Sequence, residues 1–320
     1  MKSYIGYSVD SEIRYKATSG GIGTSVLKWL FEKELIGTSI SFDFNIETLK
    51  YEPKIIHSFN EYRICGSIYH ELDLIGFIKS HLTELQGGFA CFALPCQTRA
   101  IRAIVERAGH SVYILGLTCS SQQTIEATQY LLKRLYIRKE DIKNIQYRGN
   151  GWPSGIQIYL KDGNHIIVPN NASLWNRIFH SRLFIRRKCF MCQDTLNKYS
   201  DLTLADPWLP EFLDKEKTGK TLVLYNEFEG SKNILLQCAD DGYIDIEEIN
   251  NEKAISSQQK TIVRKNSYRK SLTLVRKYVK IINSTFYQKM IECPLLFAAH
   301  CKIRVFFERY LVSKLPHNKA

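Results

Sequence analysis

No apolar run in the 320-residue sequence comes close to the roughly 20 residues that a membrane-spanning helix needs. The N-terminus, MKSYIGYSVDSEIRYK, is polar and carries acidic side chains early, unlike a signal peptide. Hydrophobic residues nevertheless make up 44% of the chain and aromatic residues 12%, which is enough to bury a substantial core. We therefore expect a cytoplasmic globular protein with one large domain or two modest ones.

The sequence also lacks the short motifs of several large enzyme classes. It contains no P-loop, no GxSxG and no GxGxxG, so kinase, hydrolase and Rossmann dehydrogenase interpretations are without support. Its eight histidines are scattered, with no HExxH motif and no pairing of histidine with cysteine as metal ligands.

An excess of positive charge is missing from most of the chain, although the formal net charge is +12. Residues 261–320 hold 13 Lys and Arg against 2 Asp and Glu, whereas the preceding 260 residues hold 31 against 30. A nucleic-acid enzyme usually carries its positive charge around its site. We therefore expect no nucleic-acid partner, and the basicity belongs to the C-terminal segment.

The middle of the chain alternates between buried strands and helices. GFACFAL at 88–94 and SVYILGL at 111–117 are short apolar runs, and a segment of helical period follows each. Strand, helix, strand and helix in this order predict a parallel sheet. A hairpin is expected around Asp162-Gly163 and amphipathic helices beyond residue 260, one through Met290 and a second from Pro294.

The predicted fold class is therefore α/β (α+β mixed). It has a parallel-sheet core with flanking helices, a β-hairpin insertion and a C-terminal helical extension. We expect a main domain over residues 1–255 and a basic helical tail over 256–320.

Ser19-Gly20-Gly21 precedes a segment of helical period that Gly37 is expected to cap. Glycines at a helix start let a phosphate approach the backbone N–H groups, although the motif taken alone favours an ordinary N-cap with a flexible lead-in. Arg148 and Asp206 each follow a predicted strand. They could bind a ligand or serve at the surface and in a turn.

Nine cysteines without a signal peptide indicate reduced thiols, some of them candidate metal ligands. Cys96 and Cys119 each follow a predicted parallel strand, so both should lie at the same edge of the sheet. Cys189 and Cys192 form a CxxC pair, which lets two thiolates reach one metal. The four thiols suit an iron–sulfur cluster or zinc, and unrelated buried cysteines remain the alternative.

In their order along the chain, these pieces resemble the coenzyme F-420 hydrogenase/dehydrogenase beta-subunit family, over roughly residues 5–250. The stretches that carry the resemblance are ATSGGIGTSVLKWLFEKELIG, CGSIY, GGFACFALPCQTRAI, YILGLTC, IQYRGNGWPSGIQIYLKDG, CFMCQD, SDLTLADPW and the segment from NEFEG to DGYIDI.

The resemblance implies an iron–sulfur flavoprotein that binds one FAD and one [4Fe-4S] cluster. It implies Cys96, Cys119, Cys189 and Cys192 as cluster ligands. It places the flavin against Ser19, Gly20, Gly21 and Thr24, with Arg148 and Asp206 nearby.

The implied function is an oxidoreductase that takes electrons from a separate ferredoxin-like donor and passes them through the cluster and FAD to an organic acceptor. Short relatives of this kind suggest polysaccharide biosynthesis as the setting.

Two stretches depart from the family pattern. GSIY has Ile68 where a basic residue is common, and the stretch CSSQQT, which begins with Cys119, lacks the His-Gly pair that relatives often have after this cysteine. These departures motivate an alternative, a non-catalytic cluster-bearing scaffold. A zinc-stabilised sugar-modifying protein in a polysaccharide pathway is a further alternative.

The basic tail has three interpretations. It could lie against an anionic membrane at the inner face, or dock an acidic ferredoxin. It could also pack on the main body with a solvated basic face.

Overall fold

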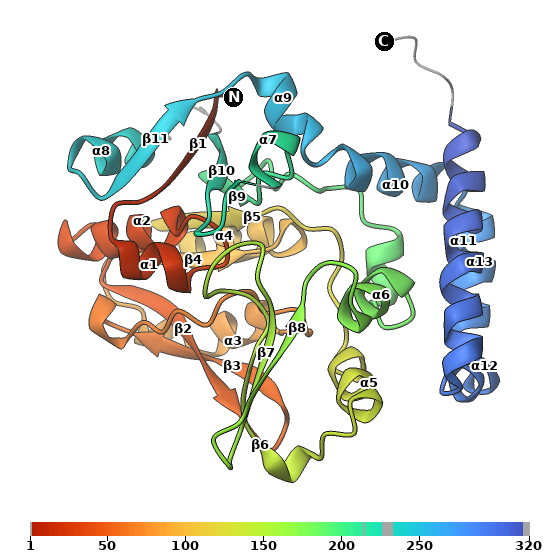
Figure 1. Cartoon of the computed structure of the whole chain (residues 1–320). Helices are drawn as coiled ribbons and strands as arrows, with labels where there is room; N and C mark the ends of the chain where they lie inside the picture. Colours follow the sequence, from red (N-terminus) through yellow and green to blue (C-terminus); the bar gives the residue numbers. More distant parts are fainter. Residues whose placement is uncertain (1, 214, 226–232, 316–320) are drawn as a thin grey trace.

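The computed structural model describes residues 2–213, 215–225 and 233–315. Its centre is an eight-stranded mixed sheet in the order β11-β1-β10-β9-β5-β4-β2-β3 (Figure 1). Four neighbouring strands are parallel: β2 (Thr38–Asn45), β4 (Phe89–Ala93), β5 (Val112–Leu117) and β9 (Leu202–Ala205). The antiparallel strands are β1 (Lys2–Ser8), β3 (Lys50–Ile56), β10 (Thr221–Tyr225) and β11 (Ile244–Glu248). The expected α/β class with a parallel core is confirmed.

The strand–helix–strand unit predicted from the apolar runs is present as β4, α4 (Pro95–Arg107) and β5. Pro95 starts α4 with its fixed backbone angle, and the Gln97 side chain accepts the N–H of Leu94 at 2.9 Å. Ile101 and Val105 then pack α4 onto the sheet with no exposed surface. Because β4 and β5 are parallel, Cys96 and Cys119 both follow strands that end at the same edge.

The first long helix is shorter than expected. It is α2 (Ile22–Glu32), and Glu34 takes the left-handed conformation just after it, with φ of 56°. Gly37 is not its cap, which corrects the prediction. The N–H of Gly37 instead donates to the carbonyl of Gly88 at 2.9 Å, and a Cβ there would lie 2.5 Å from the carbonyl oxygen of Gln86. Close approach between two chain segments therefore explains this glycine.

The expected hairpin is part of a second, three-stranded antiparallel sheet. It consists of β6 (Ile142–Gln146), β7 (Gly155–Leu160) and β8 (His165–Pro169). Gly163 has φ of +91° in the turn, and the Asp162 carboxylate accepts the N–H of Asn164 at 2.9 Å. The remaining helices up to residue 256 are α1 (Ser11–Lys16), α3 (Leu74–Ser80), α5 (Glu126–Arg134), α6 (Leu174–Ser181), α7 (Pro210–Leu213), α8 (Ile234–Asp240) and α9 (Asn251–Ser256). The predicted start of the α8 segment, Ser231, lies outside the described residues.

The tail contains more helices than the two predicted. The expected helix through Met290 is divided into α10 (Gln259–Lys270), α11 (Leu272–Ile282) and α12 (Thr285–Met290), and α13 (Pro294–Ser313) follows. Ser271, with φ of −117° and ψ of 35°, interrupts the first two. Ser284 caps α12 by accepting the N–H of Tyr287. A regular apolar spacing hid these breaks, because serine carries no strong helix-breaking signal of its own.

Helices α11, α12 and α13 lie along one side of the main body (Figure 1). Apolar side chains of the tail are buried together with those of the main body. Tyr268, Phe297 and Leu311 belong to one hydrophobic cluster with Tyr130 and Trp175. The packed arrangement is therefore the one observed, while contact with a membrane or a ferredoxin stays a prediction, as does the division at residue 255. Among the helices that the structure describes, none combines the length and the apolar character needed to cross a bilayer.

Candidate functional site

A cavity of about 1320 Å³ runs from the start of α2 to the tail helices. Thr24 and Leu117 contribute to its wall on the side of the main sheet, while Arg264 and Glu308 contribute from the tail. The ends of β5 and β9 open into it, as expected for the carboxyl edge of a parallel sheet. The main body and the tail therefore share one ligand-sized space.

Five of the six predicted cofactor residues line this cavity: Ser19, Gly21, Thr24, Arg148 and Asp206. Gly21 caps α2 with φ of +80° and no side-chain hydrogen bond. Within the described ranges, no acceptor pairs with the N–H groups of Ile22, Gly23 and Thr24, the first of the helix. This helix start can accept an anion.

Gly20, the sixth residue, does not line the cavity. Its N–H donates to the hydroxyl of Thr221 at 2.8 Å, and its carbonyl accepts the N–H of Ser8 at 2.6 Å. A Cβ at Gly20 would lie 2.6 Å from both the carbonyl oxygen of Gly6 and the backbone nitrogen of Thr221. Packing between β1 and β10 therefore accounts for this glycine.

Replacing Gly20 by Ala is expected to destabilise the protein by about 1–3 kcal/mol, because backbone atoms of two strands must move. Urea unfolding of the full chain measures the change. Ser19→Ala is the matched control, since it removes one hydroxyl contact with Thr221 without adding an atom. Equal stability of Gly20→Ala and the wild type would contradict the packing explanation.

Arg148 and Asp206 bind each other at the wall of the cavity. The two terminal nitrogens of Arg148 lie 3.1 Å and 3.0 Å from the Asp206 oxygens, and one of them donates to the carbonyl of Thr18 at 2.9 Å. Trp152 Nε1 donates to Asp206 at 2.8 Å. Burial opposes the charge of Arg148, but the Asp206 carboxylate outweighs it and raises the pKa of Arg148. Arg148 Nε is buried without a partner among the described residues, so one donor remains for a ligand.

Backbone and side-chain contacts bring the cysteine segments together. The N–H of Cys119 donates to the carbonyl of Thr195 at 3.0 Å, just beyond Cys192. Asn197 connects the same loop to the start of α4, since its Nδ2 donates to the carbonyl of Ala93 at 2.8 Å and its Oδ1 accepts the hydroxyl of Thr98 at 2.7 Å. The segment before Cys189 is connected to the one after Cys119, where the N–H of Arg186 donates to the carbonyl of Gln122 at 3.2 Å.

Two of the four predicted thiols, Cys119 and Cys189, have raised pKa values. Burial raises the pKa of the Cys119 thiol to about 12, and the charges of Cys189, Cys96 and Cys192 act in the same direction. Burial also raises the pKa of Cys189, with Cys192 and Cys96 adding to the effect. Cys119 alone of the four lines the cavity. In the part of the chain that the structure describes, no three His, Cys, Asp or Glu side chains form a site for a single metal ion.

Lys265 is a neighbour of the thiols that the sequence analysis missed. It is 3% exposed, and its ammonium donates to the carbonyls of Cys119 at 2.8 Å and Asp194 at 2.6 Å. Its third contact is the Cys192 sulfur at 3.5 Å. Nothing in the sequence distinguishes this lysine from the other basic residues of the tail, because only the docking of α10 brings it to the thiols.

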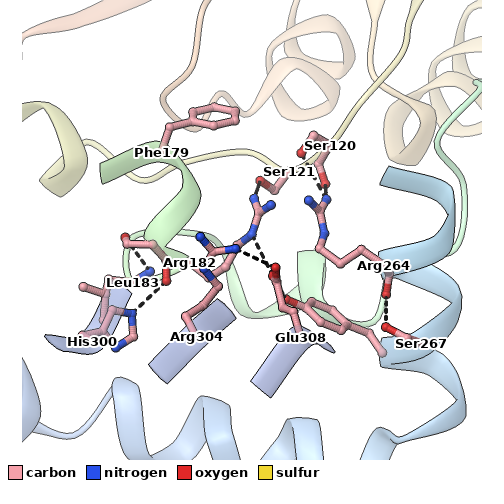
Figure 2. A network of polar contacts seen from close by, with 12 residues as sticks. Ser120, Ser121, Phe179, Arg182, Leu183, Arg264, Ser267, His300, Arg304 and Glu308 are labelled. Carbon is pink, nitrogen blue, oxygen red and sulfur yellow. Dashed lines mark hydrogen bonds and ion pairs between the residues drawn. The ribbon is translucent and has the colours of Figure 1, made fainter. Parts of the chain in front are cut away.

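The CSSQQT segment also contacts α10 of the tail and Arg182 at the end of α6 (Figure 2). Arg182 donates to the hydroxyl of Ser121 at 3.2 Å, and Arg264 donates to the carbonyl and hydroxyl of Ser120 at 2.9 and 3.1 Å. The two residues that follow Cys119 therefore connect the thiol region to a group of arginines that the sequence did not reveal.

Comparisons with known proteins were made over the whole chain. Residues 3–79 match the model for "Coenzyme F420 hydrogenase/dehydrogenase, beta subunit N-term", and residues 88–252 match the model for the C terminus of the same subunit. The chain is 24% identical over 326 residues to the F420-dependent formate dehydrogenase subunit beta of Methanocaldococcus jannaschii, covering 95% of this chain and 79% of the relative.

The fold also resembles a solved chain of the F420-reducing [NiFe] hydrogenase complex from Methanosarcina barkeri. The TM-score is 0.62 at 17% identity, with 83% of this chain and 90% of the other covered. Both matched family models end before α10, so the tail helices lie outside them.

Proposed function

Because the chain belongs to the coenzyme F420 hydrogenase/dehydrogenase beta-subunit family, we propose that it is an iron–sulfur flavoprotein that reduces an organic acceptor. Its relatives are redox subunits of larger hydrogenase and dehydrogenase enzymes. We propose a separate protein, of ferredoxin type, as the electron donor, since the named relatives work as subunits beside other chains.

Cys96, Cys119, Cys189 and Cys192 would hold the [4Fe-4S] cluster, because four cysteine thiolates are the usual ligand set for it. The observation that carries this proposal is the position of Cys119. It lines the cavity, its N–H donates to Thr195 in the loop after Cys192, and one ammonium, that of Lys265, contacts both its carbonyl and the Cys192 sulfur. Lys265 supports the assignment, since its buried ammonium lies 3.5 Å from the Cys192 sulfur and its charge favours the thiolate form of Cys119.

The cavity fits a flavin that carries phosphate groups. The open N–H groups at the start of α2 and the unpartnered Nε of Arg148 are two sets of donors for an anion. A volume of about 1320 Å³ leaves room for FAD and for part of an acceptor. When bound, the cluster would supply one-electron transfer and the flavin two-electron chemistry, while the protein supplies binding and orientation.

Anaerobic purification with quantification of iron, sulfide and flavin tests the proposal. We expect about four irons and one flavin per chain. Stoichiometric zinc in a colourless protein would overturn it and favour the zinc-stabilised alternative. A full cluster with no flavin would favour the scaffold. The setting in polysaccharide biosynthesis remains a prediction, which this experiment does not address.

A further inference from the structure

Arginines gather at the end of the cavity that the tail closes (Figure 2). Arg182 ends α6, Arg264 lies in α10, and Arg304 lies in α13; all three line the cavity. Among the described lining residues only Asp206 and Glu308 are acidic, and Asp206 is already bound to Arg148. This end of the cavity therefore holds more positive than negative charge.

Glu308 is shared between two of the arginines. Its carboxylate lies 2.7 Å from a terminal nitrogen of Arg304 and 3.4 Å from Arg182 Nε, and it also accepts the Tyr268 hydroxyl at 2.5 Å. The side chain of Arg182 is 2% exposed and that of Glu308 15%. Although burial opposes ionisation of Glu308, Arg182 and Arg304 hold its pKa below the ordinary value. One carboxylate is thus shared by two guanidinium groups and neutralises only one of the two charges.

Arg264 has only neutral hydrogen-bond partners, both on Ser120, and no ion pair within the described residues. Burial, together with the charges of Arg182 and Arg304, lowers its pKa to about 10, so it is still charged at neutral pH. His180, beside them, adds no charge, because burial and the three arginines lower its pKa to about 4. Arg304 Nε is also buried without a hydrogen-bond partner among the described residues.

Three guanidinium groups and one carboxylate leave two uncompensated positive charges in a partly buried space. Such an arrangement is costly unless an anion completes it. A phosphate group carries about −1.5 to −2 charge at neutral pH and binds the planar fork of arginine through two parallel hydrogen bonds. Its negative charge matches the two uncompensated positive charges, and its oxygens match the hydrogen-bonding geometry of the guanidinium groups.

We propose that Arg182, Arg264 and Arg304 form a binding site for a phosphate or diphosphate group of the organic acceptor. The identification of the occupant as the acceptor rests on the proposed function, whereas binding of the anion does not. Ser120 places the site next to Cys119 along the chain, at the same cavity as the proposed flavin. Arg264, Arg304 and Glu308 lie beyond residue 252, where the family match ends, so the tail supplies most of the site.

Calorimetric titration of the full-length, anaerobically purified protein with inorganic pyrophosphate tests the proposal. We expect saturable binding of one pyrophosphate at this site that persists in sodium chloride near physiological ionic strength. Arg264→Gln is expected to weaken binding at least tenfold. Arg276→Gln is the matched control, because this exposed arginine lies on the neighbouring helix α11, away from the cavity lining, and should leave binding unchanged.

A second variant and a second anion serve as further controls. Arg304→Gln replaces Arg264→Gln if the latter does not fold, as judged by circular dichroism. Succinate should bind at least tenfold more weakly than pyrophosphate, because its carboxylates carry less charge each. No binding to the wild type, equal loss in Arg276→Gln, or equal affinity for succinate would overturn the proposed site.

Iron and flavin are quantified in the same preparation, which separates the two proposals. Binding that is sensitive to Arg264→Gln in a protein without iron or flavin would overturn the proposed function and retain the anion site. Full iron and flavin without pyrophosphate binding would overturn the anion site and retain the proposed function. In a protein loaded with flavin, the flavin would occupy the helix start of α2. Sensitivity of pyrophosphate binding to Arg264→Gln then assigns the titrated anion to the tail site.

Discussion

Replacing Cys119 by Ala is expected to lower the iron content of the anaerobically purified protein from about four per chain to less than one. Cys119 follows the buried strand β5 and is fixed by its N–H bond to Thr195 and by the Lys265 ammonium on its carbonyl. The Cys91 thiol cannot take its place, because it lies within the core of β4 and is 1% exposed. Iron and sulfide assays measure the effect.

Cys293→Ser is the matched control for this variant. Cys293 is exposed at the start of α13 and is not one of the four proposed cluster ligands, so the iron content should stay at the wild-type value. Circular dichroism and gel filtration test whether Cys119→Ala still folds. Retention of all the iron by a folded Cys119→Ala protein would refute the proposed ligand set, and loss of iron in both variants would show that the effect is not local.

The part of the site that follows from the parallel sheet could be predicted from the sequence. Apolar runs of strand length at 88–94 and 111–117 fixed two neighbouring strands, and their ends fixed the edge where Cys96 and Cys119 lie. The CxxC pair was visible by its spacing. Its position beside the other two thiols depends on hydrogen bonds of Thr195 and Asn197, which no periodicity reveals.

The tail shows where prediction from sequence stops. Arg264 and Ser120 are separated by 144 residues, and Lys265 and Cys119 by 146, so only tertiary packing brings them together. The charge count located the basic segment but not the few side chains that turn inward. Gly37 and Gly20 illustrate the same limit, because each is required by another chain segment across a short gap rather than by its own helix.

The cavity thus joins two kinds of recognition. Its sheet side offers the backbone N–H groups at the start of α2 and Cys119, which follows β5 and donates its N–H to the carbonyl of Thr195. Its tail side offers guanidinium groups held by one shared carboxylate. The sheet side is assigned to the proposed flavin, and the arginines of the tail side then remain for an anionic group of the acceptor.

Replacing Asp206 by Asn is expected to destabilise the protein by about 3–5 kcal/mol, because it leaves the guanidinium of Arg148 buried without its counter-ion. Arg148 is 2% exposed, and the Asp206 side chain is 16% exposed, so water compensates little. The substitution also disturbs the bond from Trp152 Nε1. Urea unfolding at fixed iron and flavin content measures the loss, and flavin content should fall with it.

Asp43→Asn is the control for Asp206→Asn, because its ion pair with Arg63 lies in solvent and should contribute little to stability. The double variant Arg148→Met/Asp206→Leu separates charge from packing. Removing both charges should recover part of the stability lost in Asp206→Asn, since a buried charge without a partner is costlier than an apolar pair. Unfolding of Asp206→Asn at the same urea concentration as Asp43→Asn would show that the buried pair does not stabilise this wall of the cavity. It would also contradict the proposal that the pair positions Arg148 to offer its free Nε to the flavin.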